Sequence, residues 1–85
     1  MTFYVYLLLS VNCKKNHTYV GYTKNLNRRL FLHNTSKGAK FTRGRKWKLI
    51  YKKKFGSKSI AMKEEHKLKK NYVKRKMIKE KFINK

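Results

Sequence analysis

The 85-residue chain has few acidic residues, little cysteine and no long apolar stretch. Its only acids are three glutamates, too few for an elaborate two-metal carboxylate site. The single cysteine, Cys13, excludes an intrachain disulfide and indicates a reducing compartment, so we expect a cytoplasmic protein. The N-terminal apolar run, residues 3–11, is too short to cross a membrane and lacks the features of a signal peptide. We therefore interpret it as a β-strand.

Positive charge and aromatic residues are abundant. The chain has 25 lysines and arginines and a net charge of +22, a density that repels itself unless a polyanion offsets it. Nucleic acid is the preferred partner, in the cytoplasm or at the nucleoid, and we expect no membrane partner. The apolar fraction of 40%, with six tyrosines and five phenylalanines, is enough for one modest hydrophobic core. We expect a single folded unit.

The first half of the chain predicts two strands and a helix. Residues 3–11 and 18–22 are rich in aromatic and branched residues, which favours an antiparallel hairpin that Gly21 ends. A helix follows from Asn25, with Thr23 or Asn25 as its N-cap. One stripe of this helix combines two apolar and two polar side chains: Leu26, Arg29, Leu30 and His33.

The second half predicts a loop, a strand and helices. Residues 34–46 contain two glycines and many hydroxyl and basic groups, which is typical of a loop. Residues 47–55 predict a third strand with one basic face, whose apolar side chains alternate: Trp47, Leu49, Tyr51 and Phe55. A helix capped by Ser57 or Ser59 should then carry a stripe formed by Ala61, Glu65, Leu68 and Tyr72. Residues 73–85 form a basic extension that either is an amphipathic helix or frays.

Two charged side chains stand among apolar neighbours on the predicted helices. Arg29 and Glu65 therefore pair with each other, reach water at the rim, or belong to a site, because an unpaired buried charge is costly. Glu64 is placed almost as well as Glu65, and periodicity does not choose between them. One glutamate, with phosphate oxygens and water, could hold one magnesium ion. Otherwise, each glutamate forms a plain salt bridge to a neighbouring lysine.

Histidines and tyrosines are the remaining candidates. The spacing of Cys13, His17, His33 and His66 matches no standard zinc site, so we expect no zinc. His33 shares its stripe with Arg29 and is either a phosphate donor or a surface residue. Most tyrosines are explained as strand and core residues. That explanation accounts less well for two tyrosine-rich strands that lead directly into the stripe with Arg29 and His33.

Five ordered segments resemble the GIY-YIG nuclease family over residues 1–72. They are "YVYLL" (4–8), "TYVGYT" (18–23), "NRRLFLHN" (27–34), "KGAKFTRGRKWKLIY" (37–51) and "SKSIAMKEEHKLK" (57–69). The similarity is greatest to small single-domain members and to the nuclease domain of branch-cutting, structure-specific relatives. The first family motif is altered here, because Tyr4 replaces its glycine.

The resemblance implies an α+β fold, a three-stranded antiparallel sheet flanked by helices, with residues 1–72 as the nuclease-like domain and 73–85 as its extension. It also implies hydrolysis of a phosphodiester with one divalent metal, Mg²⁺ or Mn²⁺. The implied catalytic residues are Tyr6, Tyr19, Arg29, His33 and Glu65. Glu65, rather than Glu64, would hold the metal, and Arg29 would stabilise the transition state. Tyr6 would act as general base or orient the water, which requires nearby positive charge or the metal to favour the phenolate.

The implied partner is DNA, with RNA left open. Basic residues of the third segment would follow the sugar-phosphate backbone: Lys37, Lys40, Arg43, Arg45 and Lys46. Specificity would come from the shape of branched, flap or nicked DNA, in repair or recombination, or from a partner protein. The alternative is a noncatalytic basic protein that binds nucleic acid on the same fold. A protein that only binds the sugar-phosphate backbone needs positive charge, and it has no need for an acid beside Tyr6, Arg29 and His33.

Overall fold

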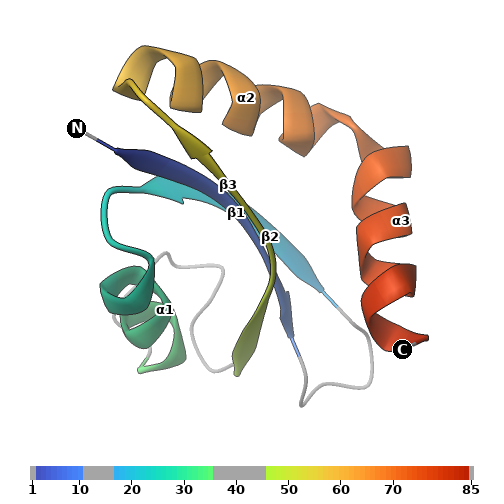
Figure 1. The fold of residues 1–85 in the computed structure, drawn as a ribbon. Helices are drawn as coiled ribbons and strands as arrows, with labels where there is room; N and C mark the ends of the chain where they lie inside the picture. Colours follow the sequence, from blue (N-terminus) through green and yellow to red (C-terminus); the bar gives the residue numbers. More distant parts are fainter. Residues whose placement is uncertain (1, 11–16, 36–45, 85) are drawn as a thin grey trace.

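The computed structural model describes residues 2–10, 17–35 and 46–84 (Figure 1). Three strands and three helices follow one another: β1 (Phe3–Ser10), β2 (Thr18–Thr23), α1 (Leu26–Asn34), β3 (Trp47–Phe55), α2 (Lys58–Lys70) and α3 (Tyr72–Ile83). The strands form one antiparallel sheet in the order β2-β1-β3. The predicted α+β fold with a three-stranded sheet is confirmed. None of the helices in the described ranges has the length and hydropathy to cross a membrane.

The central strand β1 carries most of the core. Its side chains from Val5 to Ser10 are all 2% exposed or less, because helices cover both faces of the sheet. On one face, Tyr6 and Leu8 pack with Trp47 and with side chains of α1. On the other face, Val5, Leu7 and their neighbours pack against α2 and α3. Figure 1 shows α1 on one side of the sheet and α3 on the other.

Strand β3 departs from the predicted alternation. The register shifts between Leu7 and Leu8 of β1, so that Leu8 pairs with Leu49 and Leu7 pairs with Tyr51. Paired residues share a face, and this irregularity therefore puts Leu49 on the face of α1 and Tyr51 on the opposite face. The prediction that these two residues share one face is wrong. The single basic face is wrong too, because Lys52 pairs with Tyr6 and Lys53 pairs with Val5.

Asparagine and serine side chains cap the helices as expected from their chemistry. Asn25 accepts from the backbone N–H of Arg28, and Ser57 accepts from that of Ile60, which selects one of the two predicted caps at each helix. Asn71 then ends α2 and caps α3. Tyr72 consequently starts a new helix and is 64% exposed, so its predicted place on the stripe of α2 is wrong.

Helix α3 falls on the residues predicted as the basic extension. Its Ile78 packs against the core cluster of Val5 and Leu7, and Lys48 of β3 lies over the ring of Phe82. The helical alternative for this segment is confirmed. The division into a domain of residues 1–72 and an extension of residues 73–85 stays a prediction.

Candidate active site

Tyr6 lies at the centre of the site, on the middle strand. Its side chain is 2% exposed, and its hydroxyl lies 3.0 Å from Nε2 of His33, a side chain with no exposed surface. The two residues are 27 positions apart in the chain and meet because α1 covers this face of the sheet. A tyrosine and a histidine thus form a buried hydrogen-bonded pair.

Tyr19 extends this pair towards the edge strand β2. Its ring centroid lies 5.0 Å from that of His33 and 6.4 Å from that of Tyr6. On its other side it meets Trp47 edge-on, at 6.4 Å. Such tilted contacts suit the charge distribution of aromatic rings. The four rings hold the Tyr6 hydroxyl in a fixed position.

Gly21 gives the Tyr6 ring its space. It lies inside β2, directly opposite Tyr6, and the strand continues to Thr23, so the predicted role of Gly21 as the strand end is wrong. A Cβ atom at Gly21 would lie 2.5 Å from Oη and 2.7 Å from Cζ of Tyr6. Only glycine allows the phenol to lie against the neighbouring backbone at this position.

Helix α1 is held at both ends. Its N-terminus is capped by Asn25, and its inner side chains Leu26 and Leu30 pack against the cluster of Tyr6 and Leu8. At its C-terminal end, the amide of Asn34 donates to the carbonyl of Trp47 at 3.2 Å and accepts from the Trp47 N–H at 2.6 Å. These two bonds tie the helix that carries Arg29 and His33 to β3.

Burial decides the protonation state of Tyr6. It raises the pKa of Tyr6 to about 12, and the hydrogen bond and positive charge of Arg29 oppose this without reversing it. Tyr19 and Glu65 contribute further to the increase in the Tyr6 pKa. The positive charge of Arg29 lowers the Tyr6 pKa, as expected, but burial outweighs it. The metal, the other expected source of positive charge, stays a prediction. Tyr6 is a neutral phenol at physiological pH.

The pKa values of His33 and Arg29 shift in opposite directions. Burial, with a smaller effect of the nearby Arg29 charge, lowers the pKa of His33 to about 4. His33 is thus neutral at physiological pH, and Nε2 can accept from the Tyr6 hydroxyl when the ring proton is on Nδ1. Hydrogen bonding to Tyr6 is the largest cause of the raised pKa of Arg29. Arg29 remains a cation beside the phenol.

A surface hollow opens beside this group. It has a volume of about 380 Å³ and is lined by Tyr6, Tyr19, Gly21, Tyr22, Thr23, Arg29 and Glu65. Glu65 comes from α2, whose contacts with β2 bring it to the sheet edge, and its carboxylate forms an ion pair with Lys69 at 3.3 Å. Its side chain is 17% exposed. One acidic, one cationic and three phenolic side chains thus surround the hollow, together with Gly21 and Thr23.

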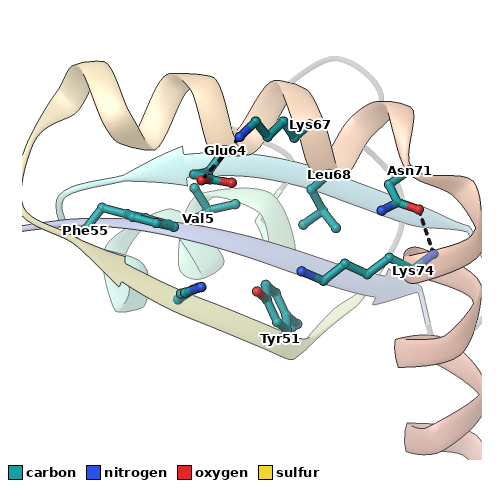
Figure 2. Close-up of a pocket in the computed structure, with 9 residues that line it drawn as sticks. Val5, Tyr51, Phe55, Glu64, Lys67, Leu68, Asn71 and Lys74 are labelled. Carbon is teal, nitrogen blue, oxygen red and sulfur yellow. Dashed lines mark hydrogen bonds and ion pairs between the residues drawn. The ribbon is translucent and has the colours of Figure 1, made fainter.

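The neighbouring glutamate points elsewhere. Glu64 lines a separate groove with Val5, Tyr51 and Leu68 on the opposite side of the sheet, where Lys67 pairs with it at 3.8 Å (Figure 2). The structure therefore distinguishes Glu64 from Glu65, which periodicity alone does not.

The donor set of the hollow suits one hard cation. The described residues contain no group of three His, Cys, Asp or Glu side chains that could enclose a metal. Mg²⁺ commonly uses one or two carboxylates and completes its octahedron with waters and substrate phosphate oxygens. The partly exposed carboxylate of Glu65, in a hollow with room for a phosphate, fits such a site.

Five of the predicted site residues come together in the structure. Tyr6, Tyr19, Arg29, His33 and Glu65 are grouped around the hollow and the ring cluster behind it. Lys46 is exposed just before β3, and the predicted contacts Lys37, Lys40, Arg43 and Arg45 lie outside the described residues. The two hydrogen bonds between the Asn34 side chain and the Trp47 backbone were not predicted, because a polar residue at a helix end does not indicate its distant partner.

The three-stranded antiparallel sheet between helices makes this a small α+β domain, with tyrosine, arginine and glutamate side chains grouped around one hollow. The chain matches the family model of the GIY-YIG catalytic domain over residues 2–78 and belongs to that family.

Within this family, the chain is similar to proteins named UPF0213. It is 51% identical to a UPF0213 protein of Oceanobacillus iheyensis over 67 residues, 78% of this chain and 74% of the relative. It is 46% identical to a UPF0213 protein of Staphylococcus haemolyticus, over 78% of each chain. It is also similar to the solution NMR structure of a UPF0213 protein from Bacillus halodurans, with a TM-score of 0.51 and 38% identity over 93% of this chain and 84% of that one.

Proposed function

We propose that this protein is a metal-dependent endonuclease that hydrolyses DNA phosphodiester bonds and selects branched, flap or nicked structures. The observation that carries the proposal is the buried Tyr6–His33 pair, which opens beside Arg29 onto a hollow that also contains Glu65. Membership of the GIY-YIG family supports the nuclease class.

In this proposal, Tyr6 and His33 move a proton together. The attacking water gives its proton to the Tyr6 hydroxyl oxygen while the hydroxyl proton passes to Nε2 of His33, 3.0 Å away. The water oxygen forms the new P–O bond, and the bond to the leaving sugar oxygen breaks. This relay needs no free phenolate, which agrees with the raised pKa of Tyr6, and it needs a neutral imidazole, which agrees with the lowered pKa of His33.

Arg29 and Glu65 have complementary roles. Arg29 binds the non-bridging phosphate oxygens, on which charge develops in the transition state. Glu65 would hold Mg²⁺ or Mn²⁺. The chemistry that the ion would supply there is Lewis-acid stabilisation of negative charge on the phosphate. Tyr19 packs against His33 and keeps the ring aligned with Tyr6.

The basic surface supports DNA as the substrate in this proposal. The net charge of +22 attracts a phosphate backbone without reading its bases. Selection then depends on the shape of the nucleic acid or on a partner protein, with RNA as a second substrate to be tested. The proposed setting is DNA repair or recombination in the cytoplasm.

The decisive assay uses end-labelled branched, flap and plain duplex DNA, and matched RNA, with Mg²⁺ or with a chelator. Wild type is compared with Glu65→Ala and with Glu64→Ala, the adjacent control whose carboxylate lines the other groove. We expect metal-dependent cutting by wild type and Glu64→Ala, and a loss of at least about 100-fold in Glu65→Ala with binding retained.

The alternative function has its own signature. A noncatalytic nucleic-acid-binding protein, which the high net charge favours, would bind equally with metal or chelator and would cut none of these substrates. That result would replace the endonuclease proposal.

A further inference from the structure

Arg75 of α3 is held in a fixed orientation away from the candidate active site. Its Nε donates to the carbonyl of Leu68 at 3.1 Å, and its guanidinium lies over the ring of Tyr72, 5.8 Å from the ring centroid. Two interactions therefore fix the plane of the guanidinium. With Nε engaged, the donors that remain are those of the two Nη groups, which suit two oxygens of one phosphate.

A groove lies beside this arginine. It has a volume of about 270 Å³ and is lined by His17, Thr18, Tyr72, Arg75, Lys76 and Lys79. These lining residues include three permanent cations and no acid, whereas the groove in Figure 2 combines its lysines with Glu64. Tyr72 adds an aromatic ring that is 64% exposed. Cations around a rigid guanidinium, beside an exposed ring, are the chemistry that binds a nucleic-acid strand.

The groove is on the opposite side of the sheet from Tyr6. Thr18 pairs with Leu9 of β1, whereas Gly21, three positions further along β2, pairs with Tyr6. Successive side chains of a strand alternate between its two faces, so the Thr18 side chain is on the face opposite Tyr6, which is the face of α2 and α3. Ile78 anchors α3 to that same face, and Figure 1 shows α1 and α3 on opposite sides of the sheet. The groove and the hollow beside Tyr6 share no lining residue and are therefore separate sites on the surface.

We propose that Arg75, Lys76 and Lys79, with Thr18 and Tyr72, form a second phosphodiester-binding site, which takes the arm of a branched nucleic acid that is not being cut. This inference rests on the proposed endonuclease function for its biological meaning, and on the geometry of α3 with its neighbours β2 and α2 for its binding chemistry. It gives the fold a means of preferring branched over linear substrates: one contact on each face of the sheet.

The test measures binding without catalysis. Fluorescence anisotropy compares a three-way DNA junction with a linear duplex of equal nucleotide count, without divalent metal, on a Glu65→Ala background. Two variants remove the site: Arg75→Lys, which keeps the charge and loses the planar fork, and Lys76→Gln with Lys79→Gln, which leaves the Leu68 bond intact. Lys81→Gln is the matched control, because Lys81 is on α3 but lines another groove.

We expect the background protein and the Lys81 control to prefer the junction. Arg75→Lys should lower that preference about tenfold, the effect of one charge-assisted hydrogen bond. The double lysine variant should lower the preference and reduce the salt slope of junction binding by about 2. If thermal unfolding shows that Arg75→Lys is destabilised, the double variant decides.

The outcomes separate the two proposals. No preference for the junction in the background protein, or an unchanged preference in the double variant, overturns the second site whether or not wild type cuts DNA. A preference lost in the double variant supports the site even if wild type cuts nothing with Mg²⁺, in which case only the endonuclease proposal fails.

Discussion

Replacing Gly21 with alanine should push the Tyr6 phenol away from His33. The added methyl group would lie 2.5 Å from Oη and 2.7 Å from Cζ of Tyr6, where ordinary contact begins at 3.4 Å. The far end of an exposed side chain could rotate away at little cost. Tyr6 has no such freedom, because its side chain is 2% exposed and is hydrogen-bonded to His33.

The size of the effect follows from this overlap. The ring or the strand must move by roughly 1 Å, a misplacement that typically costs about 100-fold in rate. Overpacking should lower the free energy of unfolding by about 1–3 kcal/mol. A weakened Tyr6–His33 hydrogen bond should cost about 1 kcal/mol of this.

The assay combines urea unfolding with cleavage of a branched DNA substrate. Gly56→Ala is the matched control, because a Cβ at Gly56 meets no atom within 4 Å and should leave both quantities nearly unchanged. In a Tyr6→Ala background, Gly21→Ala should lose most of its effect on stability. Equal stability and cleavage for Gly21→Ala and Gly56→Ala would refute the close-packing explanation.

Three further substitutions test the surroundings of Tyr6. Because the pKa of His33 is lowered from 6.5 to about 4, folding favours its neutral form, and the resulting stability is present above pH 6.5 and lost as the pH falls towards 4. Urea unfolding should show a loss of roughly 3 kcal/mol over this range, which His33→Gln removes. Asn34→Ala should lower the free energy of unfolding by about 1–3 kcal/mol, measured in urea, because it leaves the Trp47 backbone groups unsatisfied; a change below about 0.5 kcal/mol would contradict this. Tyr6→Phe should cut at least about 100-fold more slowly in single-turnover assays while binding DNA normally, and full activity would exclude the proton relay.

The local patterns predicted the elements well, because they depend on residues close in sequence. Runs rich in aromatic and branched residues indicated the strands, and side-chain oxygens at Asn25 and Ser57 indicated where helices begin. The stripe of Leu26, Arg29 and His33 placed the arginine and the histidine on one face of α1, where the structure has them. These features require only the geometry of one helix or strand.

Features that depend on pairing between distant segments were not predictable. The irregularity in β3 that separates Leu49 from Tyr51 exists only in its register with β1. The close approach that requires Gly21, and the burial that keeps Tyr6 protonated, likewise arise from the packed sheet. One local feature was missed as well: the Asn71 side chain caps α3, so α2 ends before Tyr72 and Tyr72 lies at the surface.

The position of Tyr6 on the middle strand has a consequence for the motions of the molecule. Its backbone is paired with Gly21 on one side and with Lys52 on the other, beneath helices on both faces. Amide hydrogens in such a strand exchange with solvent only when the whole domain opens. The centre of the proposed chemistry is therefore the last part of the chain to unfold, and adaptation to a substrate falls to α1, α2 and the edge strand around it.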